Sequence, residues 1–111
     1  MARPERVKRV CKEPGYTCFV PQGTEGKNDW ITLTVEEYEA LRLIDLEGVS
    51  RQECAARMDI ARTTAQGIYN SARAKMAECI VKGMELHIEG GAFSICDGSA
   101  GCPDCTRTSG I

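Results

Sequence analysis

The feature that most constrains the fold is the stretch from Ser50 to Met76, whose helical periodicity is interrupted at Asp59 and Ile60. Ser50 and Glu53 stand three residues apart, which is the spacing of a capping box at a helix start. Apolar residues recur at helical spacing on both sides of the interruption. They are Cys54, Ala55 and Met58 before it, and Ala65, Ile68, Ala72, Met76 and Ile80 after it. The pattern therefore predicts a short helix, a turn and a longer helix.

The second predicted helix carries polar side chains on the face opposite its apolar residues. Long hydrogen-bond donors and short hydroxyls with little bulk suit the base edges in the major groove of DNA. This arrangement is typical of a helix-turn-helix DNA-binding unit, and the alternative is an ordinary helical hairpin with a polar outer face. The candidate contacts to bases and phosphates are Arg51, Arg62, Thr63, Thr64, Gln66, Asn70, Arg73 and Lys75.

Charge is distributed unevenly along the 111 residues, although the formal net charge is only −2. Residues 1–13 hold five basic residues against two acidic ones, and residues 50–83 hold six against three. Between them, residues 28–49 hold six acidic residues against Arg42, and we interpret this stretch as a solvated helix face. The basic N-terminal arm is suited to the minor groove or to phosphates. Its candidate contacts are Arg3, Arg6, Lys8 and Arg9.

Proline and glycine punctuate the first 29 residues, which predicts irregular structure there. We expect short extended pieces around residues 7–11 and 30–33. Thr34 and Glu37 have the spacing of a second capping box, and they predict a helix that Gly48 ends.

A β-hairpin is predicted near the C-terminus, because residues 84–89 and 92–96 flank the turn-forming pair Gly90 and Gly91. A lone hairpin is only marginally stable, so its apolar face must pack against the helices or another subunit. Pairing with the N-terminal arm, in the same chain or a neighbouring one, is a further alternative. A homodimer is attractive because a two-fold axis suits a palindromic DNA site. The apolar face would hold Leu86 and Ile88 opposite Phe93 and Ile95.

Three cysteines, Cys96, Cys102 and Cys105, cluster in the glycine-rich tail. Two residues separate the last two, which allows both sulfurs to bind one tetrahedral ion. Four thiolates suit either zinc or an iron–sulfur cluster. The alternatives are a dithiol redox motif, which lacks the βαβ setting it needs, and a tail whose thiols have no role.

The fourth ligand of such a site must come from elsewhere in the chain. Cys11 is the best candidate because it ends the basic arm, and Cys18 and His87 are alternatives. Cys54 and Cys79 lie on apolar helical faces, so we expect them in the core.

The sequence also indicates several absences. Neither a signal peptide nor a membrane span is recognisable, so we expect a cytoplasmic protein that does not associate with membranes. In that compartment we do not expect the seven cysteines to form a disulfide framework. Paired carboxylates, a nucleophile with its base and a phosphate-binding loop are all missing, so we do not expect an enzyme.

These features predict a mainly α-helical protein with a three-helix helix-turn-helix domain. Residues 1–33 are the irregular basic arm, residues 34–83 the helix-turn-helix domain, and residues 84–111 the hairpin and cysteine-rich tail. The length allows little more than one compact domain.

Several motifs are distinctive in combination. They are Met1-Ala2-Arg3-Pro4, Cys11 with Pro14, Phe19-x-Pro21-x-Gly23, the run from Glu37 to Gly48, the helix-turn-helix, and Ile88-Glu89-Gly90-Gly91. The combination covers residues 1 to about 96 and resembles a small prokaryotic family of predicted DNA-binding proteins, the domain of unknown function 134. This resemblance implies a transcription regulator that binds double-stranded DNA.

The predicted reading unit is also similar to region 4 of bacterial sigma factors. That similarity keeps a module that binds RNA polymerase as an alternative, beside a metal-handling or redox-sensing protein. Two residues depart from the expected pattern. Ala61 stands where Ser or Thr would cap the second helix, which weakens the cap by about 1 kcal/mol. Gly67 lies inside that helix at a similar cost.

Overall fold

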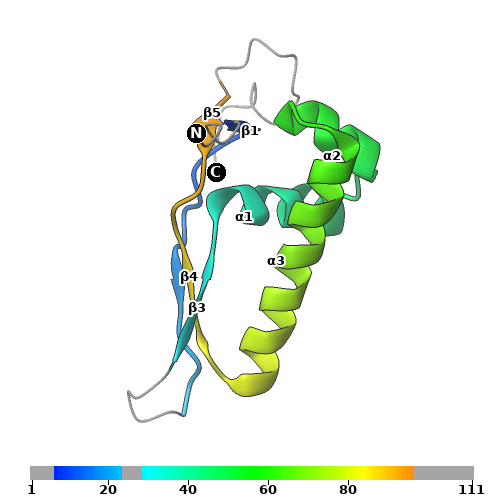
Figure 1. Ribbon diagram of the computed structural model, residues 1–111. Coiled ribbons are helices and arrows are strands. Elements are labelled where there is room, and N and C mark those ends of the chain that lie inside the picture. The colour runs from blue at the N-terminus through cyan, green and yellow to red at the C-terminus, as the bar shows by residue number, and fades with distance from the viewer. Residues whose placement is uncertain (1–6, 24–28, 97–111) are drawn as a thin grey trace, which may run out of the picture.

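The computed structural model describes residues 7–23 and 29–96, which form three α-helices, one π-helical turn and five short strands. Figure 1 shows α3 along one side, the strands along the other, and α1 bridging the two. The predicted mainly helical chain with a small sheet is confirmed at this level. In chain order the elements are β1 (Lys8–Val10), β2 (Cys18–Phe19), β3 (Trp30–Leu33), α1 (Val35–Leu41), η1 (Arg42–Leu46), α2 (Arg51–Met58), α3 (Arg62–Lys82), β4 (Glu85–Ile88) and β5 (Phe93–Ile95).

The helices begin where the sequence predicts. Thr34 and Glu37 form a complete capping box, with distances of 3.2 and 2.9 Å between donor and acceptor atoms. At α2 only half of the box forms, because the Glu53 carboxylate accepts from Arg57 instead of from the backbone of Ser50. Helix α1 continues into the π-helical turn η1, whose wider winding was not predicted.

Three residues separate α2 from α3. Asp59 ends α2 in the left-handed conformation with φ of 60°, and Ala61 begins α3 without a side-chain hydrogen bond, as predicted. Gly83 ends α3 in the left-handed conformation, which is the usual role of glycine after a helix. The predicted order of a short helix, a turn and a long helix is confirmed.

Four of the five strands form at the predicted places, whereas β2 was not predicted, and the predicted hairpin does not form. β4 is the middle strand of a three-stranded sheet, antiparallel to β2 and parallel to β3, whereas β5 pairs in parallel with β1. The prediction that residues 84–89 and 92–96 pair with each other is therefore wrong. The alternative, in which they pair with the N-terminal arm, is confirmed within the same chain.

Strand pairing and two hydrogen bonds explain why the chain does not reverse at Gly90 and Gly91. Both edges of β4 are already occupied by β2 and β3. The connecting residues also bond to the first turn of α1, where the carbonyl of Gly90 accepts from the Val35 amide at 3.1 Å. The Ala92 amide donates to the Glu36 carboxylate at 2.8 Å. The chain thus passes over the start of α1 and continues to β1.

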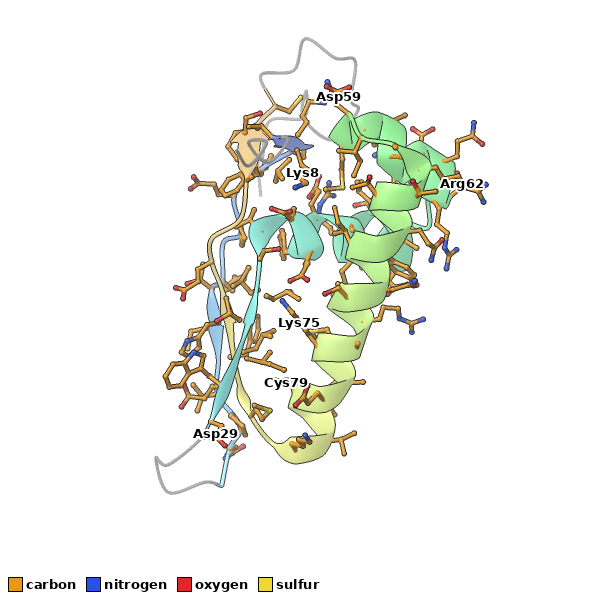
Figure 2. The ribbon with its side chains drawn as sticks, viewed as in Figure 1. Lys8, Asp29, Asp59, Arg62, Lys75 and Cys79 are labelled. Atoms are coloured by element: carbon orange, nitrogen blue, oxygen red, sulfur yellow. The ribbon has the colours of Figure 1, made fainter. Side chains whose placement is uncertain are left out.

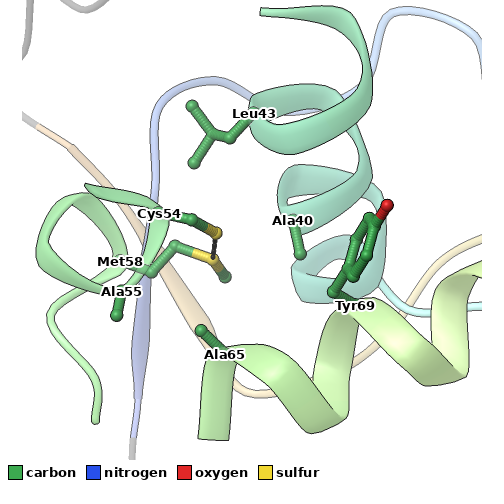
Figure 3. Close-up of a cluster of buried hydrophobic side chains, with 7 residues drawn as sticks. All are labelled: Ala40, Leu43, Cys54, Ala55, Met58, Ala65 and Tyr69. Carbon is green, nitrogen blue, oxygen red and sulfur yellow. Dashed lines mark hydrogen bonds between the residues drawn. The ribbon is translucent and has the colours of Figure 1, made fainter. Parts of the chain in front are cut away.

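Buried apolar side chains form two clusters that share α1 and α3 as a common frame. The first cluster, shown in Figure 3, fixes α2 and the first half of α3 against α1 and η1. The second packs the later half of α3 against the three-stranded sheet. Cys54 and Cys79 are buried in them, as predicted. The first cluster is Ala40, Leu43, Cys54, Ala55, Met58, Ala65 and Tyr69, and the second is Leu33, Ala72, Cys79, Leu86 and Ile88.

The solvated face predicted for the acidic stretch is wrong for the three glutamates of α1, whereas Asp29, Asp45 and Glu47 are exposed as expected. Glu36, Glu37 and Glu39 are all buried, with exposed fractions of 6%, 7% and 2%. Each has a basic partner within 3.0 Å, because Lys8 pairs with Glu36, Lys75 with Glu37, and Arg42 with Glu39. A buried carboxylate is tolerated when it is paired and hydrogen-bonded. The three carboxylates thus tie α1 to β1, α3 and η1.

None of the helices in the described part of the chain has the length and apolar character needed to cross a bilayer.

Candidate nucleic-acid interface

The first turn of α3 is open to solvent. Arg62, Thr63 and Thr64 are all exposed, and Figure 2 shows Arg62 projecting from the end of the helix away from the sheet. The amides at a helix N-terminus and the helix dipole both favour an anion there. Phosphate is therefore a chemically suitable partner for this end of α3.

Farther along the same helix, Gln66 and Asn70 lie one turn apart. The Gln66 amide donates to the side-chain oxygen of Asn70 at 3.0 Å, so the two amides are held side by side. An amide can form two hydrogen bonds with one adenine edge. No Asp or Glu occurs in α3 before Glu78, so this half of the helix presents only neutral and basic side chains.

Two arginines lie beside the ring of Tyr69, at the border of this surface. The guanidinium carbons of Arg51 and Arg73 are 4.9 and 5.7 Å from the ring centroid. The Tyr69 hydroxyl donates to Asp45 at 2.8 Å, and Arg73 lies 3.5 Å from the same carboxylate. Asp45 belongs to η1, so the π-helical turn supports the position of both Tyr69 and Arg73.

Two other predicted DNA contacts have structural partners instead. The Lys75 ammonium donates to Glu37 at 2.7 Å and to the carbonyl of Thr32 at 2.9 Å. The Arg9 guanidinium donates to the carbonyls of Arg57 and Ala56, at the C-terminal end of α2. A cation at that end stabilises the helix. We therefore leave Lys75 and Arg9 out of the candidate surface.

Part of the basic arm is also packed into the fold, whereas the sequence suggested a mobile arm. Lys8 is 5% exposed and pairs with Glu36, and Val10 is fully buried. Arg3 and Arg6 lie outside the described residues. From β1 onward, the arm is a strand of the fold rather than a mobile extension.

The environment of Glu37 alters its acidity. Burial alone raises the pKa of this carboxyl group, but hydrogen bonds from Lys75, Ser71 and the Thr34 backbone outweigh it and lower the pKa below its ordinary value. Glu37 therefore keeps its negative charge beside Lys75 at neutral pH.

Two of the four predicted thiol ligands are brought together. β1 and β5 are parallel with Val10 beside Ile95, and the Cys96 amide donates to the Val10 carbonyl at 2.7 Å. Cys11 and Cys96 thus follow the last residues of two paired strands. Cys11 is 6% exposed, and its amide donates to Glu39 at 3.1 Å. The other two predicted ligands, Cys102 and Cys105, lie outside the described residues.

The two thiols in the core, Cys54 and Cys79, have raised pKa values. Burial raises the pKa of Cys54 to about 11, with a further rise from the charge of Glu39 that nearby arginines partly offset. Burial also raises the pKa of Cys79, whose sulfur lies 3.1 Å from the Met84 carbonyl. Both thiols are protonated and packed, as core residues should be.

The two alternative ligands, Cys18 and His87, lie together on the three-stranded sheet, with Glu85 beside them. Sequence reasoning missed this group because it depends on the pairing of β2 with β4. The only sequence signal was the alternation that places Glu85 and His87 on one strand face.

Comparison with known proteins identifies relatives but no activity. The sequence model of a family described as "Protein of unknown function DUF134" matches residues 1–96. A UPF0251 protein of Desulfitobacterium hafniense (strain Y51) is 48% identical over 99 residues, which are 88% of this chain and 79% of that protein. A UPF0251 protein of Caldicellulosiruptor bescii is 43% identical over 107 residues, which are 96% of this chain and 75% of that protein. Another, from Clostridium novyi (strain NT), is 40% identical over 112 residues, which are 100% of this chain and 76% of that protein. No solved structure matches the chain.

Proposed function

The chain belongs to the DUF134 family of proteins of unknown function, and we propose that it is a transcription regulator that binds double-stranded DNA. In this proposal α2, the three-residue turn and α3 act as a helix-turn-helix. α3 is the reading helix that enters the major groove.

The observation that carries the proposal is the exposed, acid-free first half of α3. An ordinary helical hairpin gains nothing from excluding acidic residues on its outer face, whereas a DNA-facing helix must avoid repulsion by phosphates. The first core cluster leaves this face uncovered, because it contacts α3 only through Ala65 and Tyr69, with partly buried Ile68 beside them.

The proposed contacts divide by chemistry. Arg62, Thr63 and Gln66 read base edges, with Thr64 and Asn70 beside them on the helix. Arg51 and Arg73 lie at the border of the surface and contact phosphates. Arg3 and Arg6 are proposed to reach the minor groove, and they precede β1 by only a few residues.

A homodimer is part of this proposal, since one reading helix covers only half of a palindromic site. Apolar side chains support it, because Ile80 and Val81 at the end of α3 are 72% and 83% exposed. Beside Ile80, a groove of about 440 Å³ lined by apolar residues lies between α3 and the sheet. A second subunit would cover these side chains.

We also propose that Cys11, Cys96, Cys102 and Cys105 bind zinc or an iron–sulfur cluster. The support is the position of Cys11 and Cys96 after paired strands, and the two-residue spacing of the other pair in the sequence. When bound, zinc would clamp the two ends of the chain together. A cluster would make DNA binding sensitive to oxidation.

The test of DNA binding is selection of bound fragments from randomly sheared genomic DNA, followed by titration of a selected duplex at several salt concentrations. We expect affinity for the selected duplex to fall steeply with salt and to exceed that for a scrambled duplex. Equal affinity for both duplexes would contradict a sequence-specific regulator. Absence of binding at low salt would contradict DNA binding itself.

A further inference from the structure

The outer face of the three-stranded sheet carries three side chains with metal-binding chemistry. Cys18 of β2 stands directly opposite His87 of β4, and Glu85 lies two residues before His87 on the same strand face. Their donor atoms, a sulfur, a nitrogen and a carboxylate oxygen, all lie within 4.8 Å of one another. We propose that Cys18, Glu85 and His87 form a zinc-binding site, made of residues other than those of the α3 surface and of the predicted thiol site.

The donor set matches zinc. Thiolate, imidazole and carboxylate are the three protein ligand types that zinc accepts, at about 2.0–2.3 Å from the ion. Donors around a tetrahedral ion at those distances are roughly 3.3–3.8 Å apart, so small rotations of these side chains suffice to close the site. A thiolate in the set disfavours magnesium and calcium, which take oxygen ligands.

The site is already partly organised. The Nε2 atom of His87 and a carboxylate oxygen of Glu85 are 3.0 Å apart, so both converge on one point. A zinc ion would take the place of the proton between them, and the Cys18 thiol would lose its proton on binding. His87 and Glu85 are 28% and 23% exposed, and Cys18 is exposed, so the ion can enter from solvent and keep a water in its fourth position.

Trp30 holds the imidazole in place. The rings of Trp30 and His87 stack with centroids 5.4 Å apart and an angle of 10° between their planes. Trp30 lies on β3, beside Glu85 in the parallel register. All three strands of the sheet thus contribute to the site, and the ion would tie the two-residue strand β2 to β4.

The stacking of Trp30 on His87 also provides a way to measure zinc binding. Trp30 is the only tryptophan and His87 the only histidine in the chain. Zinc added to the metal-free full-length protein should change the Trp30 fluorescence in a saturable way. Cobalt(II) should give a sulfur-to-metal charge-transfer absorption band. We expect Cys18→Ser, Glu85→Gln and His87→Gln each to weaken zinc binding by at least about tenfold, the loss that even outer partners cause in metal sites.

The controls separate this site from the tail thiols. Cys96→Ser should leave the Trp30 fluorescence response unchanged. Cys18→Ser should remove the cobalt band that accompanies this response. If His87→Gln does not fold, Cys18→Ser decides the question, because it changes one atom of an exposed side chain. An unresponsive parent protein, a normal response in Cys18→Ser, or loss of the response in Cys96→Ser would each overturn the proposal.

Discussion

The Lys75 ammonium of α3 lies 2.7 Å from the Glu37 carboxylate in the first turn of α1. Glu37 also accepts from Ser71, one turn earlier on α3, and from the Thr34 backbone. One carboxylate therefore completes the N-terminal cap of α1 and holds α3 against this turn of α1. The contact of Lys75 with Glu37, near the middle of α3, thus orients the helix that we propose to read DNA.

This contact predicts an asymmetry between two lysines of α3. Lys75→Ala should lower the free energy of unfolding by about 1–3 kcal/mol, because it leaves a buried carboxylate without its cationic partner. Lys82→Ala removes an exposed i,i+4 pair with Glu78 and should change stability by less than about 0.5 kcal/mol. Urea unfolding of both variants measures the difference. Equal effects would show that the Glu37–Lys75 pair is no stronger than a surface pair.

The lowered pKa of Glu37 makes part of the stability depend on pH. A carboxyl group whose pKa is lower in the folded than in the unfolded chain stabilises the fold above its unfolded pKa. That contribution is lost as the pH falls below the ordinary value of 4.5 and through the folded pKa. Glu37→Gln should therefore be less stable than the parent at neutral pH, and the difference should shrink in acid. Thermal unfolding between pH 7 and pH 3 tests this, and a difference that does not change with pH would contradict it.

Local features of the fold were predictable from the sequence, and features that depend on pairing were not. Thr34 and Glu37 identify the start of α1 because both partners lie within one turn. β1 and β3 lie within the two short extended pieces predicted around residues 7–11 and 30–33. The partner of β4 could not be predicted, because Gly90 and Gly91 suit a tight hairpin turn as well as the path over α1. Burial of Glu36 likewise depends on Lys8, which is 28 residues away in sequence.

The same distinction holds for the candidate surface. The exposed positions of Arg62, Thr63 and Thr64 follow from helical periodicity alone. Lys75 falls at a position of α3 that helical periodicity assigns to the polar, outward face. In the structure, however, β3 and the first turn of α1 lie beside it. Only the tertiary structure separates a lysine that is available to phosphate from one that holds two elements together.

Base readout is tested by substitutions along α3. Arg62→Ala and Gln66→Ala should each cost about 1–3 kcal/mol on the preferred duplex and reduce discrimination against altered sites. Arg73→Ala should weaken all duplexes alike and reduce the slope of affinity against salt. Lys82→Ala, at the opposite end of the same helix, is the matched control. A Gln66→Ala protein with normal affinity and discrimination would remove Gln66 from the reading surface.

Two truncations separate the roles of the basic arm. Removing residues 1–6 deletes Arg3 and Arg6 but leaves β1 intact, so DNA affinity should fall while circular dichroism and the unfolding midpoint stay the same. Removing residues 1–10 also deletes Lys8 and the buried Val10, and it leaves Glu36 without its cation. That protein should be strongly destabilised. Unfolding of the shorter truncation would show that the first six residues are structural as well.

The position of Cys11 gives the last prediction. A closed structural zinc site needs four ligands, and the tail with Cys96 supplies three thiols. Cys11 follows the end of β1 beside β5, so its backbone lies near that of Cys96. If it is the fourth ligand, Cys11→Ser should lower the metal content of the protein and weaken the attachment of both chain ends.

The measurement is metal analysis and visible absorption of protein purified without oxygen, for the parent, Cys11→Ser, Cys102→Ser and Cys105→Ser. Cys54→Ser is the matched control, because this buried thiol with a pKa of about 11 is protonated and packed against Met58. We expect loss of metal in Cys11→Ser, Cys102→Ser and Cys105→Ser but not in the Cys54→Ser control. The metal content of His87→Gln would be measured as well. It shows how much of the total zinc is held on the sheet, and that amount must be subtracted before the thiol variants are compared. A parent without metal or cluster would reject the thiol site, whereas full occupancy in Cys11→Ser would keep the site and exclude Cys11 from it.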